Sequence, residues 1–210
     1  MSHGEAGGAR LAASQARRMR RIVDAAVELA NRGGFEAVRL RDVAEAADVA
    51  LGTLYKYFPS KEDLLLFVVN EGTQQLERVI AERPLRGESA VERITSLFAR
   101  ANRGLSASPD LSRAAVRSIA VGGRGSELKI AAFHLRMTRL TVAALRNERL
   151  DIERPLSEPV GTEREREIAL VLSQVWFSAL LAWAAGLHPV ETVTQRLRDT
   201  ARIILGEGER

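Results

Sequence analysis

Residues 48–67 read DVALGTLYKYFPSKEDLLLF, and this stretch changes character at Pro59. The part before the proline gathers a threonine, two tyrosines and a lysine, side chains suited to contact with a polar partner. The part after it has the spacing of an amphipathic helix. Proline disfavours a helical residue before it and has no backbone N–H to donate. The pattern therefore predicts that a short helix ends here and that a longer one begins, with Ser60 as its N-cap.

The composition of the chain favours an all-α fold. The 210 residues are 46% hydrophobic and only 5% aromatic, and no run alternates with the period of a strand. Alanine, leucine, arginine and glutamate dominate from end to end, and all four are good helix formers. Apolar periodicity, with its Pro and Gly stops, predicts about nine helices, at residues 16–32, 40–47, 51–58, 60–83, 89–107, 109–121, 127–149, 163–185 and 189–205.

The first three of these helices have the arrangement of a helix-turn-helix, because the second and third are joined by a turn of about three residues. Asp48 tolerates the left-handed backbone of such a turn, and Val49 fills the gap between the two helices. In this motif the later helix enters the DNA major groove, with its N-terminal residues at the base edges. We therefore predict that Leu54 and Phe58 point inward and that the opposite face contacts double-stranded DNA.

The residue types on and around that face suit phosphate and base contacts. Gly52 lets a backbone approach closely, whereas the tyrosine hydroxyls and lysine ammonium groups donate to phosphate or base acceptors. Lys61 begins the next helix, where the helix dipole also favours a phosphate. The predicted DNA-binding residues are Arg39, Arg41, Leu51, Gly52, Thr53, Tyr55, Lys56, Tyr57 and Lys61. The arginines between residues 10 and 21 fit either a DNA-contacting arm or a solvated helix start.

The segment RDVAEAADVALGTLYKYFPSKEDLL, residues 41–65, resembles the DNA-binding segment of the TetR family of bacterial transcriptional regulators. The resemblance implies a repressor that binds a palindromic operator and is released by a small effector. It divides the chain into a disordered arm (1–14), a helix-turn-helix DNA-binding domain (15–60) and a ligand-binding and dimerisation domain (61–210). Three positions depart from the family pattern: Arg39 and Ala50 replace capping hydroxyls, and Asp48 replaces a glycine. Each lost cap costs about 1 kcal/mol.

A homodimer is expected, because one helix-turn-helix reads too few base pairs to be selective. Residues 168–190 contain no charged residue and present two apolar faces, which require two partners, and residues 189–205 follow a near-heptad pattern. The predicted dimer interface consists of Leu172, Val175, Ala179, Val193, Leu197 and Ile204. In the alternative, both helices close a monomeric core.

An effector pocket is predicted among the aromatic and flexible apolar residues of the C-terminal half, although such residues at helical spacing are also typical of plain core. The candidate lining residues are Phe98, Phe133, Met137, Trp176, Phe177 and Leu180. Within the TetR family, GGFEAV (33–38) and VWFSALLAW (175–183) resemble regulators of sterol catabolism. That resemblance implies a small apolar effector in the form of a steroid-derived acyl-CoA thioester. A drug or a fatty acid is the alternative.

The sequence gives no basis for an enzyme. It has no cysteine, HExxH or GxSxG motif, so we predict neither a catalytic site nor a metal or cofactor. Residues 168–190 are long enough to span a bilayer, but polar residues near their middle favour a buried helix and no membrane association. The first fifteen residues lack a secretory apolar run, so a cytoplasmic location is expected. A non-specific architectural DNA-binding protein would explain the arginines, but not the large apolar C-terminal half.

Overall fold

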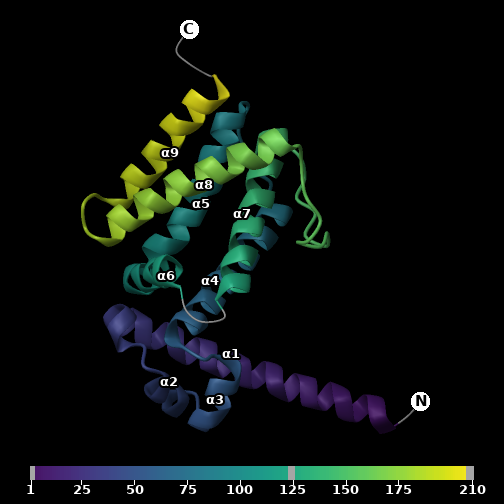
Figure 1. The fold of residues 1–210 in the computed structure, drawn as a ribbon. Helices are drawn as coiled ribbons and strands as arrows, with labels where there is room; N and C mark the ends of the chain where they lie inside the picture. The colour runs from purple at the N-terminus through teal and green to yellow at the C-terminus, as the bar shows by residue number, and fades with distance from the viewer. Residues whose placement is uncertain (1–2, 123–125, 207–210) are drawn as a thin grey trace.

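The computed structural model describes residues 3–122 and 126–206, and every regular element in these ranges is an α-helix (Figure 1). The helices are α1 (His3–Ala37), α2 (Leu40–Ala46), α3 (Leu51–Tyr57), α4 (Lys61–Glu82), α5 (Ala90–Ala107), α6 (Pro109–Val121), α7 (Glu127–Arg146), α8 (Glu163–Ala184) and α9 (Val190–Leu205). Nine helices in the described part of the chain confirm the predicted all-α fold. From α2 onward their ends agree with the predicted ends to within a few residues.

The start of α1 differs from the prediction. The first helix is predicted to begin near residue 16, whereas α1 begins at His3 and projects from the side of the molecule (Figure 1). Residues 1 and 2 of the predicted disordered arm (1–14) lie outside the described residues. Residues 9–13 are alanine, arginine and leucine, all strong helix formers, so the helix continues outward from its packed part. The exposed side chains of Arg10 and Ala12 show that this extension gains little from packing. At its other end α1 is broken by Gly33 and Gly34, as predicted, and Gly34 adopts a φ of 63°.

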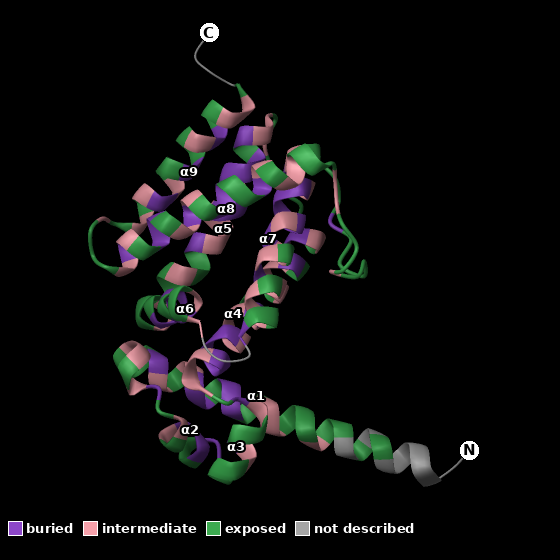
Figure 2. Ribbon diagram, viewed as in Figure 1, coloured by how far each residue is buried: buried purple, intermediate pink, exposed green. Residues whose placement is uncertain are grey.

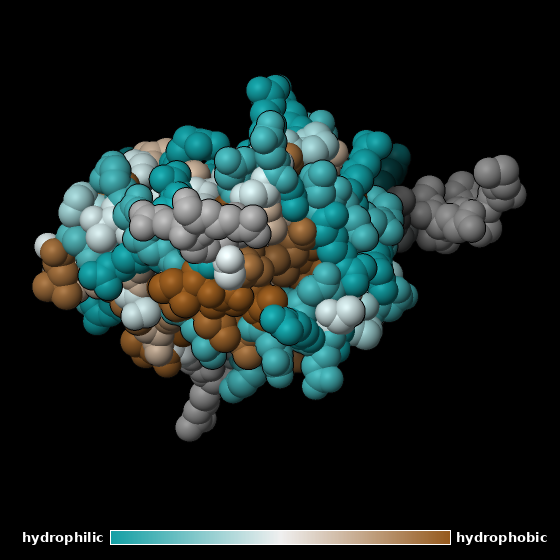
Figure 3. Space-filling view, turned by 90° about the horizontal axis from the view of Figure 1, so that it is seen from above, coloured by the Kyte–Doolittle hydropathy of each residue, from teal (hydrophilic) through white to brown (hydrophobic). Residues whose placement is uncertain are grey.

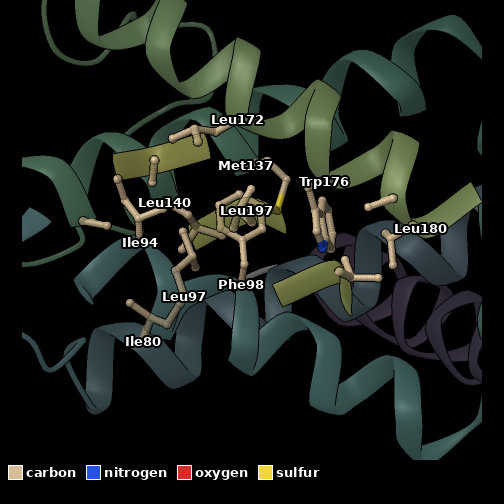
Figure 4. Packing of buried hydrophobic residues seen from close by; sticks show 14 of the residues in the cluster. Ile80, Ile94, Leu97, Phe98, Met137, Leu140, Leu172, Trp176, Leu180 and Leu197 are labelled. Carbon is tan, nitrogen blue, oxygen red and sulfur yellow. The ribbon is translucent and has the colours of Figure 1, made fainter. Parts of the chain in front are cut away.

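The buried apolar residues form two clusters. The head cluster lies among α1, α2, α3 and the start of α4, with one residue from α6. It comprises Ile22, Ala25, Ala26, Ala30, Val38, Val43, Ala44, Ala47, Leu54, Phe58, Leu64, Leu65 and Ala114. The body cluster is larger and collects side chains from the rest of α4 and from α5 to α9 (Figures 2 and 4). Leu64 and Leu65 of α4 belong to the head cluster, whereas Ile80 belongs to the body cluster. The helix α4 therefore runs from one core into the other.

Four of the six predicted dimer residues lie inside the core of the single chain. Leu172, Ala179, Val193 and Leu197 are at most 5% exposed, because they pack in the chain's own body core, and Figure 4 shows Leu172 and Leu197 there. Val175 and Ile204 are half-buried. Both faces of α8 are apolar, so periodicity alone could not tell which one turns inward. The outward face instead carries Leu170, Val171 and Leu181, which are 47%, 41% and 39% exposed.

Among the described helices, α8 alone is long and apolar enough to cross a membrane by length and composition. In the fold it packs against α7 and α9, and 39% of its most apolar window is buried. A core helix of a soluble protein passes the same test. The prediction that protein surrounds α8 holds for one face of the helix only, within a single chain.

Candidate DNA-recognition helix and effector pocket

The turn between α2 and α3 has the backbone that the sequence predicts. Asp48 is left-handed, with a φ of 51°, and its N–H donates to the carbonyl of Glu45 at 3.1 Å. The N–H of Val49 then donates to the carbonyl of Ala44 at 3.0 Å. Ala44 is buried, so the two helices approach closely at this point. The turn fixes the direction in which α3 leaves α2.

The helix α3 has one buried and one exposed face. Leu54 is fully buried and Phe58, directly after the helix, is 1% exposed, so both point inward as predicted. Phe58 meets Phe67 of α4 edge-on, with ring centroids 5.4 Å apart. The other side of α3 carries Leu51, Gly52, Thr53, Tyr55 and Lys56, which we call the recognition face. All of these are exposed except Thr53, which is half-buried.

Three further predicted DNA-binding residues lie at the start of α2 or at the end of α3. Arg39 and Arg41 are exposed at the start of α2, whereas Tyr57 is half-buried against the head cluster. Arg39 and Ala50 are the N-caps of α2 and α3, and neither gives a side-chain hydrogen bond to its helix. Ser60 does cap α4 as predicted, because its hydroxyl accepts from the N–H of Asp63 at 3.1 Å.

Lys61, predicted to bind phosphate, also has partners within the protein. Its ammonium donates to the carbonyl of Phe35 at 3.2 Å, lies 3.6 Å from the Glu36 carboxylate and sits 3.9 Å from the centre of the Phe35 ring. Arg117 of α6 approaches the same Phe35 ring at 4.2 Å and pairs with Glu36 at 2.8 Å. These contacts join the start of α4 to the last turn of α1, beyond the break at Gly33 and Gly34. Sequence periodicity carries no signal for such a contact.

Gly52 has open space around it on the recognition face. A Cβ built on Gly52 would meet no atom within 4 Å, so the fold does not require a glycine there. Glycine in a helix is less favourable than alanine by roughly 0.5–1 kcal/mol. A glycine that the fold does not need, on an exposed helix face, is consistent with close approach by an external partner.

A cavity of about 690 Å³ lies in the body, lined by residues of α4, α5, α6, α7 and α8. This volume is within the range of about 300–1,000 Å³ found for small-molecule sites. Five of the six predicted lining residues are present, namely Phe133, Met137, Trp176, Phe177 and Leu180. Phe98 is the exception: it is fully buried behind Trp176, with ring centroids 5.1 Å apart, and supports that ring from the side.

Sequence reasoning missed the wall that α4 contributes. Val68, Val69, Gly72, Leu76 and Val79 line the cavity, although none of them is aromatic. The available signal was Gly72, which lies in the middle of a long helix where alanine would be more stable. A Cβ on Gly72 would meet nothing within 4 Å, because the residue opens on the cavity.

The orientation of Trp176 is fixed by a buried chain of hydrogen bonds. Its indole N–H donates to Oδ1 of Asn102 at 2.9 Å, and Nδ2 of Asn102 donates to the hydroxyl of Thr194 at 2.8 Å. Asn102 is 5% exposed, so each of these polar groups depends on its neighbour. The chain ties the pocket wall of α8 to α5 and α9.

Polar contacts also hold α4 against α7 along its length. Asp63 is 1% exposed and pairs with Lys129 at 2.7 Å, near the head. At the pocket level, Glu77 is 3% exposed and pairs with Arg136 and Arg139, both at 2.5 Å. The helix that joins head and pocket is therefore fixed at both ends to the same neighbour.

A helix-turn-helix joined by one long helix to a helical body with an apolar cavity is the arrangement of a ligand-controlled transcriptional regulator. The chain belongs to the TetR family of bacterial regulatory proteins. Residues 22–68 match the family model described as "Bacterial regulatory proteins, tetR family", and residues 87–204 match "Tetracyclin repressor-like, C-terminal domain".

Similar proteins agree with this assignment. The chain is 34% identical to the HTH-type transcriptional repressor KstR of Rhodococcus jostii, over 94% of this chain and 87% of that protein. A TetR transcriptional regulator from Rhodococcus sp. RHA1 has a TM-score of 0.77 and 26% identity, covering 91% of this chain and 97% of that one. FadR of Thermus thermophilus, solved in complex with lauroyl-CoA, has a TM-score of 0.63 and 23% identity, covering 91% and 96%.

Proposed function

We propose that the protein is a ligand-released repressor that binds a palindromic operator as a homodimer in the cytoplasm. The observation that carries the proposal is the course of α4, which has its first turns in the head core and its middle in the wall of the cavity. A displacement of α4 at the cavity must therefore move the recognition face. The names of the KstR relatives support repression as the direction of control.

The recognition face is the DNA-contacting surface in this proposal. Tyr55 is 51% exposed and Lys56 is exposed beside it, so a hydroxyl and an ammonium can both reach phosphate or base acceptors. Leu51 is 37% exposed, and an apolar side chain of this kind can contact a thymine methyl group. Arg39 and Arg41 are exposed at the start of α2 and add positive charge to the helix-turn-helix.

The exposed apolar side of α8 is the proposed dimer surface, in place of the residues predicted from the sequence. Leu170, Val171 and Leu181 are exposed there, and Ile203 of α9 is 82% exposed. Figure 3 shows an apolar area gathered on one face of the body. Two copies joined through such a surface would place two recognition faces on half-sites about 34–36 Å apart, or a multiple of this distance.

The effector is an apolar molecule in the body cavity, and an acyl-CoA thioester, with a steroid or fatty acyl part, is the class that the comparisons favour. Release requires that the effector binds more tightly to the shape of the dimer that fits DNA poorly, because equal affinity for both shapes shifts nothing. The paired contacts between α4 and α7 limit α4 to movement with its neighbour, which supports a tilt rather than local unfolding.

An electrophoretic mobility shift assay tests the proposal. The DNA probe is an inverted repeat from the sequence upstream of the gene, and random DNA at the same salt concentration is the competitor. We expect the protein to bind the repeat selectively, Lys56→Ala and Tyr55→Ala to weaken binding, and Arg149→Ala, an exposed change in the body, to leave it unaltered. Equal affinity for random DNA would contradict the proposal and favour the architectural alternative.

A further inference from the structure

The interior of the cavity offers no charge to a ligand. Its deep wall consists of Phe133, Met137, Trp176 and other apolar side chains. The hydroxyl of Thr73 donates to the carbonyl of Val69 at 2.8 Å, so it is already engaged within the helix. The hydroxyl of Ser112 likewise donates to a backbone carbonyl, that of Leu105, at 2.9 Å. The part of a ligand that enters this space must be apolar.

The rim of the cavity is positively charged. Arg83 at the end of α4 and Arg100 and Arg103 on α5 line it, and no acidic residue does so in the part of the chain that the structure describes. Arg83 and Arg103 are exposed, and Arg86 is exposed just beyond Arg83. None of Arg83, Arg86 and Arg103 has a carboxylate within 4.0 Å among the described residues. We call Arg83, Arg86, Arg100 and Arg103 the arginine rim.

Arg100, one member of the arginine rim, stabilises the fold. The Arg100 guanidinium donates to the carbonyl of Arg83 at 2.5 Å and to that of Pro84 at 3.1 Å, so it fixes the end of α4 beside α5. Its pKa is lowered from the ordinary value, first because burial removes water from the guanidinium and then because Arg103, Arg86 and Arg83 surround it with positive charge. The positive charge of this cluster is therefore not compensated by nearby acids.

We propose that the arginine rim binds the phosphate groups of an acyl-CoA thioester whose acyl part fills the cavity. The inference rests on the proposed effector pocket and assigns the part of the molecule that the apolar wall cannot recognise. Guanidinium groups match phosphate oxygens in a two-pronged geometry, and rim exposure leaves room for a bulky nucleotide outside the body.

The number of cationic groups distinguishes this head group from a simple acid. A carboxylate carries one charge and can occupy one guanidinium fork, which would leave the other arginines repelling one another. A pyrophosphate and a 3′-phosphate together bring several negative charges to the same rim. The arginine rim therefore favours the CoA thioester over the free acid of the same chain length, whether the tail is a fatty acyl chain or a steroid.

Isothermal titration calorimetry with the full chain tests the inference, using dodecanoyl-CoA, dodecanoate and CoA as probes. We expect dodecanoyl-CoA to bind at least about tenfold more tightly than dodecanoate, because charge-assisted hydrogen bonds add to the same apolar burial. Added salt should weaken binding of the thioester more than that of the acid, because it screens exposed charges.

The double variant Arg83→Gln/Arg103→Gln removes two rim charges and keeps Arg100, whose bonds hold the fold. It should lower the affinity for dodecanoyl-CoA by about tenfold or more and leave that for dodecanoate within about twofold. Arg196→Gln, a change of an exposed arginine on α9 outside the cavity lining, is the matched control and should change neither affinity. Equal affinities for the two probes, or an unaltered thioester affinity in the double variant, would overturn the inference.

The two proposals fail separately. If the wild-type protein binds dodecanoyl-CoA through the arginine rim but does not bind an inverted repeat, the repressor function is refuted and the ligand assignment is supported. If the protein binds the repeat selectively but shows no preference for the thioester, the ligand assignment is refuted and DNA binding is retained.

Discussion

Replacing Gly52 with alanine separates DNA contact from folding, because the fold gives the new methyl group free space. A Cβ at this position meets no atom within 4 Å. Alanine is preferred over glycine in a helix, and near the start of α3 the gain is about 0.5 kcal/mol. For a chain of this size we expect the Tm of Gly52→Ala to rise by about 1–2 °C.

The same methyl group should weaken operator binding. If the backbone at Gly52 approaches DNA closely, an added methyl group overpacks the contact, at about 1–3 kcal/mol in each half-site. A dimer carries the change twice, so the loss is about 2–6 kcal/mol, or at least about 30-fold in Kd. The variant should therefore be more stable and bind DNA less tightly.

The chain offers a matched control in Gly72, another helical glycine whose Cβ would meet nothing within 4 Å. Gly72→Ala should raise the Tm by about 2–4 °C, leave operator affinity unchanged and reduce effector binding, since its methyl group enters the cavity. Differential scanning fluorimetry measures the Tm, and fluorescence anisotropy with labelled operator DNA measures the operator affinity. Operator binding by Gly52→Ala that equals the wild type would refute the assignment of the recognition face.

Three further predictions concern the body. Glu77→Gln removes the buried partner of two arginines, so we expect a loss of about 3–5 kcal/mol, measured by urea unfolding. Asn102→Ala leaves the Trp176 indole N–H unpaired and should cost about 1–3 kcal/mol while shifting the tryptophan emission, whereas a Tm and emission equal to the wild type would contradict the hydrogen-bond chain. The pKa of Glu165 is lowered to about 2, chiefly by the hydrogen bond from Arg146, against an ordinary value of 4.5. Its stabilising effect should be present above pH 4.5 and disappear towards pH 2, so the difference in Tm between wild type and Glu165→Gln should shrink over that interval.

The helix-turn-helix could be predicted from the sequence because its turn and caps depend on individual residue types. Ser60 can cap only a helix that starts beside it, and Asp48 tolerates the left-handed backbone that its turn requires, so both were identifiable without a structure. The same reasoning places Leu54 and Phe58 inward from their spacing alone. These features depend on residues close together in the chain.

Some predicted site residues have surroundings in the fold that the sequence did not indicate, because those surroundings depend on contacts between distant segments. Lys61 lies at a helix start, which favours a phosphate, but the last turn of α1, at Phe35 and Glu36, supplies acceptors that only the folded chain brings near. Leu172 was assigned to the dimer surface because α8 is apolar on both faces, and only packing against α7 and α9 decides which face is buried. Phe98 has the composition of a pocket residue but lies one layer behind Trp176.

Glycines offer a way to distinguish positions that the fold requires from positions that a ligand requires. A Cβ on Gly87 or Gly161 would lie 2.7 Å from a neighbouring side-chain carbon, so the fold itself excludes any larger residue there. Gly52, Gly72 and Gly104 lie in helices and have open space instead, although alanine would make each helix more stable. Gly72 and Gly104 open on the cavity and Gly52 lies on the recognition face. Gly8 has the same open space, but it lies in the exposed extension of α1, where the helix gains little from packing. Positions where a sequence departs from local helix preference without a packing reason are expected at functional surfaces, and within the packed part of the fold Gly52, Gly72 and Gly104 lie at the two surfaces that the proposed switch requires.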